Sequence, residues 1–151
     1  MKKVALAWIA GLIAAGIGIP NAGAGGGDGK TYWLGTGDKR DSRVEFIVND
    51  GKVRDLLMLT SETRCSGGGR VSLGRSWDPI RLDGNAFRDR QASGRGAKAF
   101  VAGHVRGQKA AGRMSAKGQW FDEFCDSDIE RWKAEQVTHE EWQDAHSQSN
   151  R

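Results

Sequence analysis

Cysteine, histidine and proline are scarce in this chain. Its 151 residues include two cysteines, three histidines and two prolines. Two thiols without suitably spaced histidines make a poor zinc site, so a zinc module is not expected. No Gly-x-Ser-x-Gly motif occurs, and His139-Glu140 is not followed by the second histidine of a zinc protease. The Gly-rich stretch over residues 25–30 follows no predicted strand, which argues against a phosphate loop. We therefore expect no metal, no cofactor and no catalytic residue.

The first 24 residues have the pattern of a secretory signal. Lys2 and Lys3 precede an uncharged apolar run over residues 4–19, and Ala22-Gly23-Ala24 fits the preference of signal peptidase. A membrane anchor is the alternative, but the run is shorter than the roughly 20 residues that a spanning helix needs. No cysteine follows the run to carry a lipid, and no arginine pair precedes it. We predict cleavage after residue 24 and a periplasmic or extracellular location, with no membrane span in the mature chain.

Cleavage would leave one domain of modest basicity. Removing 24 residues from 151 leaves 127, and losing Lys2 and Lys3 lowers the formal charge from +4 to +2. Most of the basicity therefore belongs to targeting, which gives little support to a nucleic-acid partner. We expect a Gly-rich leader over residues 25–30, a β domain over residues 31–134 and an acidic tail over residues 135–151.

Both cysteines, Cys65 and Cys125, lie in the predicted mature chain. Two cysteines in an exported protein imply one bridge between them, the alternative being two free thiols or a metal pair. The bridge would close a loop of about 60 residues and contribute roughly 4 kcal/mol through chain entropy.

Short alternating runs separated by glycine and aspartate predict an antiparallel β-sandwich or flattened barrel with a short C-terminal helix. Residues 42–48 place Val44, Phe46 and Val48 on one face, and Asp50-Gly51 predicts a hairpin into residues 53–60. Further strands are expected at residues 70–75, 79–82, 85–91, 97–106, 109–116 and 129–134. Thr138 followed by Glu141 predicts the start of the helix.

Charge is unevenly distributed along the second half of the chain. Residues 81–117 contain nine lysines and arginines against two aspartates, whereas residues 120–151 contain nine acidic residues against three basic ones. The two interpretations are that both segments are simply solvated, or that the acidic tail folds over the basic strip.

The second half carries motifs at a recognisable spacing. They are Gly84-Asn85-Ala86-Phe87, Val101-Ala102-Gly103-His104-Val105, Ala110-Ala111-Gly112, Cys125-Asp126-Ser127 and Trp132-Lys133-Ala134. With an earlier cysteine after the first hairpin, this series resembles a group of small secreted bacterial β domains of poorly characterised function. The resemblance spans about residues 32–134 and departs at Val105, where the group prefers an aromatic residue. It implies a disulfide-closed β-sandwich and no catalytic residue. Independently, the small residues Ala110, Ala111 and Gly112 suggest close strand packing, and Trp132 is expected to pack on the disulfide.

The remaining polar residues give weaker hypotheses. His139 and His146 would share a solvated helix face, and His104 is expected to be an ordinary strand histidine. Ser66 before three glycines suggests a loop that binds an anion through backbone N–H groups. Acidic residues gather around Cys125 with a spacing unlike an EF-hand, so facing water is favoured over calcium binding: Asp122, Glu123, Asp126, Asp128 and Glu130.

The function expected from the sequence is that of an exported, non-catalytic binding module for a protein or glycan of the cell envelope. The candidate binding surface is aromatic, with Trp33, Trp77 and Trp120 as its residues, because exposed indole rings suit sugars and protein partners. One alternative is a small secreted inhibitor of a hydrolase such as lysozyme, presenting a loop near the disulfide. A second is a hydrolase that uses Asp122, Glu123 and Asp126.

Overall fold

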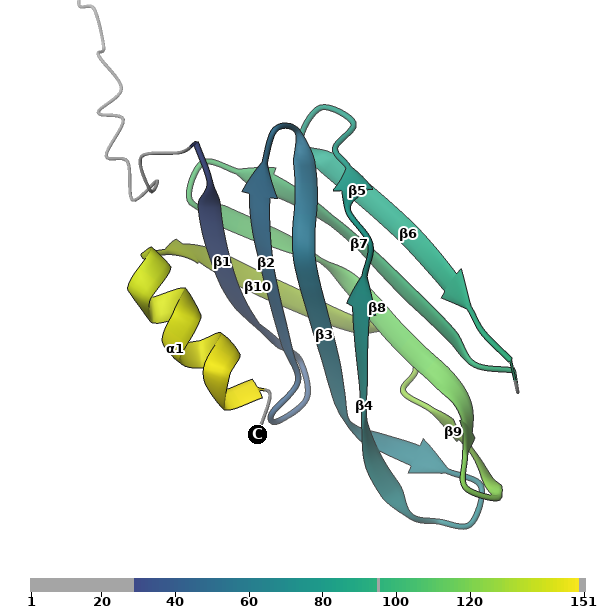
Figure 1. The fold of residues 1–151 in the computed structure, drawn as a ribbon. Helices are drawn as coiled ribbons and strands as arrows, with labels where there is room; N and C mark the ends of the chain where they lie inside the picture. The colour runs from purple at the N-terminus through teal and green to yellow at the C-terminus, as the bar shows by residue number, and fades with distance from the viewer. Residues whose placement is uncertain (1–28, 95, 150–151) are drawn as a thin grey trace, which may run out of the picture.

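The computed structural model describes residues 29–94 and 96–149, which form one β structure with a C-terminal helix (Figure 1). The predicted signal and residues 25–28 of the leader lie outside the described residues. The elements are β1 Thr31–Gly37, β2 Arg43–Asn49, β3 Lys52–Cys65, β4 Arg70–Trp77, β5 Ile80–Arg81, β6 Ala86–Ala92, β7 Lys98–Arg106, β8 Lys109–Trp120, β9 Glu123–Asp126, β10 Glu130–Val137 and α1 His139–Ser149.

Six antiparallel strands close into a barrel in the order β10-β1-β2-β3-β9-β8, with β8 pairing back to β10. The expected flattened barrel with one disulfide and one short helix is therefore confirmed. The remaining strands extend the same sheet, because β7 and β6 continue beyond β8, and β4 and β5 pair with β3. In Figure 1, β6 and β7 run alongside β8 on the side of the molecule away from α1.

The disulfide closes the shortest strand pairing of the barrel. Strands β3 and β9 pair at only two positions, Arg64 with Asp126 and Cys65 with Cys125. The predicted bridge between Cys65 and Cys125 is present. It fixes covalently a pairing that has few backbone hydrogen bonds of its own.

Local sequence explains the tight turns. Asp50 and Gly51 both have positive φ, at 51° and 67°, as a two-residue turn of primed type requires. Val44 and Phe46 of β2 are fully buried inside the barrel, as their alternation predicted. Strand β8 runs on to Trp120, and β9 is a strand that the sequence did not predict.

Aromatic rings fill the barrel where glycines make room for them. Trp132 lies edge-on to Phe46, with ring centroids 6.0 Å apart, and also contacts Phe87. A Cβ atom at Gly103 or Gly112 would come within 2.6 Å of the Trp132 ring, so both positions need glycine. The expected close strand packing at Gly112 is confirmed.

Trp132 is buried as expected, but the prediction that it packs on the disulfide was wrong. It pairs with Gly112 of β8, whereas Cys125 pairs with Gly118 of the same strand. Six residues along a strand span about 20 Å, so the ring lies far from the bridge.

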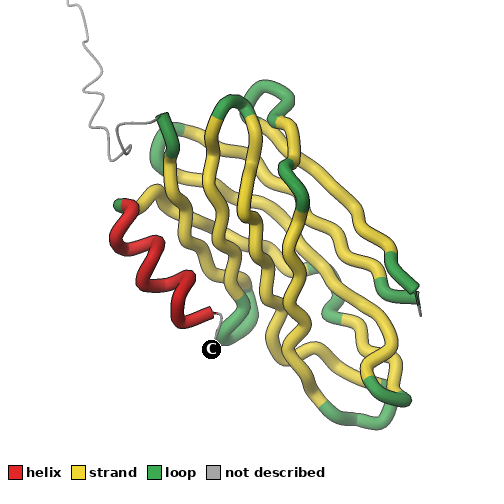
Figure 2. Tube along the Cα trace, viewed as in Figure 1, coloured by secondary structure: helices red, strands yellow, loops and turns green. Residues whose placement is uncertain are grey.

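Helix α1 packs on the outer face of β1 and β2 (Figure 2). Trp142 is buried against Tyr32 and Ile47. Thr138 begins the helix as predicted, since its hydroxyl accepts from the Glu141 N–H and its own N–H donates to the Glu141 carboxylate at 2.8 Å. Hydrogen bonds from the Thr138 N–H and hydroxyl lower the pKa of Glu141. Within the described residues, no helix is long and apolar enough to span a membrane.

Candidate functional site: a basic face beside an exposed hairpin

The structure separates the three tryptophans predicted to form a binding surface. Trp33 and Trp77 are 1% and 5% exposed and belong to the barrel core, so their assignment to a surface was wrong. Trp33 stacks on Phe46 inside the barrel. Trp120 is 46% exposed and is the one of the three that a ligand can reach.

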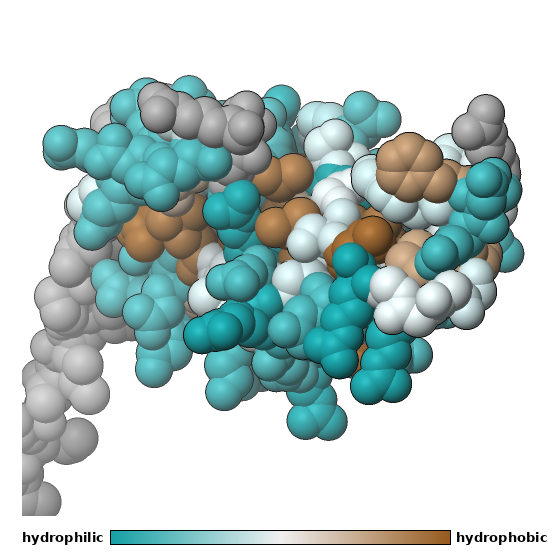
Figure 3. All heavy atoms as spheres, turned by 90° about the horizontal axis from the view of Figure 1, so that it is seen from below, coloured by the Kyte–Doolittle hydropathy of each residue, from teal (hydrophilic) through white to brown (hydrophobic). Residues whose placement is uncertain are grey.

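Exposed hydrophobic side chains are concentrated near Trp120. The large ones among the described residues all lie within ten positions of the chain: Trp120, Phe121, Phe124 and Ile129. We call the first three the apolar tip, because they lie on the hairpin formed by β8 and β9. Figure 3 looks at the molecule from the lower end of Figure 1, and hydrophobic atoms reach the surface there among hydrophilic ones.

Phe121 occupies the turn of this hairpin in a conformation that favours glycine. Its φ is 53°, and its side chain is 87% exposed. A left-handed backbone costs an ordinary residue roughly 1–2 kcal/mol, and an exposed ring gains little from burial. Its ring contacts Trp120 edge-on, with centroids 6.0 Å apart, but is otherwise left to solvent, which makes the position a candidate for binding.

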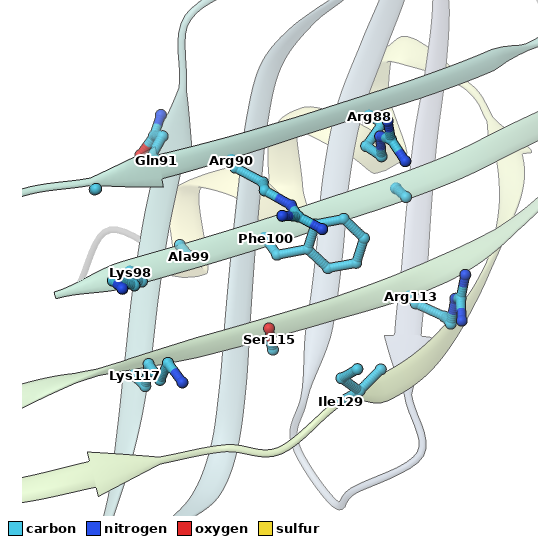
Figure 4. A pocket seen from close by; sticks show the side chains of 12 residues that line it. Arg88, Arg90, Gln91, Lys98, Ala99, Phe100, Arg113, Ser115, Lys117 and Ile129 are labelled. Carbon is cyan, nitrogen blue, oxygen red and sulfur yellow. The ribbon is translucent and has the colours of Figure 1, made fainter.

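A second feature lies beside the apolar tip, on the outer face of β6, β7 and β8. Here a hollow of about 590 Å³ is lined by five cations and by no carboxylate among the described residues (Figure 4). We call it the basic groove. Its cations are Arg88, Arg90, Lys98, Arg113 and Lys117.

The strand register explains the shape of the basic groove. Ala102 of β7 lies between Arg88 of β6 and Arg113 of β8. Strands two steps apart are separated by about 10 Å, so the small residue leaves a space between two charged walls. Two further rows complete the floor and walls, one with Arg90, Phe100 and Ser115 and the other with Lys98 and Lys117.

Few of these charges are neutralised within the protein. Lys117 contacts Asp126 at 3.7 Å, and within the described chain the other four cations have no carboxylate within 4.0 Å. Arg90 lies over the Phe100 ring, 5.4 Å from its centroid. The groove therefore keeps a positive potential that an anionic ligand would neutralise.

An adjoining hollow of about 550 Å³ extends the same face toward β5. It shares Arg88, Ala102 and Arg113 with the basic groove and adds Arg81, His104 and one carboxylate, Asp83. His104 is exposed on the outer face, opposite Ala86 and Ala111.

The acidic tail does not cover the basic strip. Its helix packs on β1 and β2, whereas the basic groove lies on β6, β7 and β8. The two histidines of the helix are not simply solvated either. His139 stacks on Tyr32, and His146 stacks on Trp142 while its Nδ1 lies 3.1 Å from the buried carboxylate of Glu45.

The loop after Cys65 already holds an anion from within the chain. The Gly67 N–H donates to the Glu123 carboxylate at 3.2 Å, and a Cβ at Gly67 would collide with that carboxylate. Ser66 pairs with the backbone of Phe124. The predicted anion-binding loop thus holds the β8–β9 hairpin in place.

The acidic residues around Cys125 do not converge. Within the described part of the chain, no group of three or more His, Cys, Asp or Glu residues could hold a metal. Glu130 points into the barrel, 3.2 Å from Lys39 Nζ. Asp122 and Glu123 line a hollow of about 360 Å³ beside the disulfide, whereas Asp126 lies apart from it and contacts Lys117.

One short segment partly matches a phosphate-loop motif. Gly29-Lys30-Thr31 matches the end of such a motif, but Thr31 begins strand β1 rather than a helix. The backbone therefore lacks the helix N-terminus on which phosphate binding in these loops depends.

Comparison with protein-family models, curated proteins and solved structures finds no significant match to this chain. The resemblance to small secreted bacterial β domains therefore stays a prediction.

Sequence reasoning noticed the basic strip but did not identify the groove. The sequence carries a signal for the groove in the spacing of its arginines. Arg88 and Arg90 are two residues apart and alternate with Phe87 and Asp89. On a strand, such spacing puts both arginines on the face opposite the buried Phe87. Reading the cations of residues 98–117 with the same period would have placed them on that face too.

Proposed function

We propose that this protein is an exported, non-catalytic binding domain that takes an anionic ligand on the outer face of β6, β7 and β8. The observation that carries this proposal is the basic groove, in which five cations surround a floor of small and aromatic residues. Export is supported by the N-terminal pattern of the sequence, and the Cys65–Cys125 bridge is compatible with an oxidising compartment.

The composition of the groove supports binding rather than catalysis. Its one hydroxyl, Ser115, shares the lining with no histidine and no carboxylate among the described residues. A nucleophile without a neighbouring base is weak. Guanidinium groups instead give bidentate hydrogen bonds to carboxylate, sulfate or phosphate oxygens.

Titration with dextran sulfate, using uncharged dextran as the matched control, tests the proposal. We expect binding of dextran sulfate that weakens steeply with salt and no binding of dextran. The double variant Arg88→Gln/Arg113→Gln removes both walls of the central row. It should weaken binding about tenfold or more and lower the log–log salt slope by about 2, since each lost contact releases about one counterion fewer.

The double variant Lys52→Gln/Arg40→Gln is the matched control, because it removes the same charge from exposed positions outside the groove. Its affinity should stay within about twofold of the wild type. Equal losses in the two double variants would reduce the interaction to net charge and contradict a built site. Absence of any binding to dextran sulfate at low salt would contradict the proposed function itself.

A further inference from the structure

Part of the apolar tip shares a face with the basic groove. Phe124 lies on that face, whereas Trp120, three residues after Lys117 on β8, faces the other side and lines hollows next to β4. Strands β8 and β9 bring the hairpin next to the groove. Gln119 pairs with Phe124 two residues along β8 from the pairing of Lys117 with Asp126. Alternation along these strands places Phe124 on the same outer face as Lys117. Ile129, which is 65% exposed, lines the basic groove with Arg113 and Lys117 (Figure 4).

We propose that this combined face docks the protein on the surface of an anionic phospholipid bilayer. The inference rests on the proposed function, since it identifies the anionic ligand as lipid headgroups. The apolar tip would enter the interface, and the cations of the basic groove would contact the phosphates.

The chemistry of the face favours a lipid surface over a soluble polyanion. A soluble polyanion needs the cations but gives no partner to Phe121, Phe124 and Ile129. Tryptophan is enriched at the headgroup level of a membrane, because its ring is apolar and its N–H is polar. Phenylalanine belongs to the apolar side of interfacial segments, which enters the boundary between headgroups and acyl chains. Lysine and arginine near an anionic surface are attracted to its phosphates, and their aliphatic stems tolerate the interface.

The shape of the tip favours a lipid surface over a folded protein partner. Phe121 is the most exposed large hydrophobic side chain in the part of the chain that the structure describes, and it lies at a turn, where it projects rather than forms part of a flat patch. Protein interfaces tend to exclude lysine from the centre of the contact, whereas here Lys117 lies one row from Phe124 on β8 and β9.

Vesicle binding by the exported chain tests this inference. Vesicles of phosphatidylglycerol and phosphatidylcholine are compared with vesicles of phosphatidylcholine alone, by sedimentation. The mass of the purified chain is determined first, because an uncleaved N-terminal apolar run would itself bind lipid. We expect partition onto the anionic vesicles at low salt and at least about tenfold weaker partition onto the neutral ones.

Tryptophan fluorescence locates the contact. Trp120 is 46% exposed, and the other tryptophans of the described residues are at most 8% exposed. Quenching by brominated lipid therefore reports chiefly on Trp120. We expect its emission to shift to shorter wavelength on the anionic vesicles and to be quenched.

Two double variants, with a third as the charge-matched control, separate the parts of the face. Phe121→Ser/Phe124→Ser should lose vesicle binding about tenfold or more while it keeps its affinity for dextran sulfate. Arg113→Glu/Lys117→Glu should lose both, whereas Arg40→Glu/Lys52→Glu should change partition much less. Melting curves of each variant confirm that it is folded.

The outcomes distinguish this inference from the proposed function. Binding of dextran sulfate without partition onto anionic vesicles would overturn membrane docking, leave the proposed function standing and point to a soluble polyanion or a protein, such as the hydrolase of the inhibitor alternative. Unchanged partition of Phe121→Ser/Phe124→Ser, or equal partition onto neutral vesicles, would also overturn it. If the wild-type protein bound neither dextran sulfate nor anionic vesicles, both proposals would be overturned.

Discussion

At the scale of single residues, Phe121 is where backbone preference and side-chain identity disagree most clearly. Its φ of 53° carries a conformational cost, and its exposed ring gains little packing beyond an edge-on contact with Trp120. Replacing it with glycine should remove the cost, offset in part by the entropy that glycine loses on folding. We expect Phe121→Gly to leave the free energy of unfolding unchanged or to raise it by up to about 1 kcal/mol, measured by urea denaturation.

The same variant should weaken binding to anionic vesicles, so stability and binding change independently. Phe124→Gly is the comparison, because glycine within a strand is destabilising. A fall in stability of more than 1 kcal/mol for Phe121→Gly would contradict this account, because it would show that the ring contributes to the fold.

Residue-scale predictions from the sequence succeeded where alternation was clear. Val44 and Phe46 alternate with polar or outward residues and are buried inside the barrel. Tyr32, Trp33 and Leu34 are consecutive and apolar, so no period indicates which of them faces inward. Trp33 fills the barrel, whereas Tyr32 and Leu34 pack with the helix, which explains why the surface assignment of Trp33 failed.

At the scale of elements, the β3–β9 pairing depends on the disulfide. Two residue pairs join these strands, and one of them is Cys65 with Cys125. The bridge has a sequence separation of 60 residues. Its removal in Cys65→Ser/Cys125→Ser should lower the free energy of unfolding by roughly 4 kcal/mol, because the unfolded chain regains loop entropy.

Urea denaturation of the double variant and of the reduced wild type measures this effect. The two should agree, since both lack the bridge. Hydrogen exchange should show faster opening of β9 than of β1 and β2, which retain full pairing. A loss below about 1 kcal/mol would mean that the hairpin is held chiefly by other contacts, such as that of Gly67 with Glu123.

Sequence patterns predicted the elements that carry standard turn and cap residues. Asp50-Gly51 and the Thr138–Glu141 cap gave a hairpin and a helix start that the structure confirms. Strand β9 was missed because its turn has phenylalanine where glycine is usual and because Asp122-Glu123 suggested an exposed acidic cluster. The turn at Phe121, whose unusual residue prevented the prediction of β9, is also part of the candidate binding surface.

At the scale of the whole molecule, closure arises from pairings between distant segments. The contacts of β10 with β1 and of β8 with β10 turn a curled sheet into a barrel. Local sequence does not encode such pairings, which is why sandwich and barrel stood as alternatives. Closure puts β6, β7 and β8 away from α1, so the basic face is left uncovered by the acidic tail.

Amide-resolved NMR during titration with dextran sulfate tests the central claim most directly, because it shows where an anionic ligand binds. The account predicts that shifts concentrate on residues 86–92, 98–104 and 111–117, that uncharged dextran causes none, and that α1 stays unaffected. Shifts spread evenly over all exposed lysines and arginines, or concentrated on β1, β2 and the helix, would contradict it.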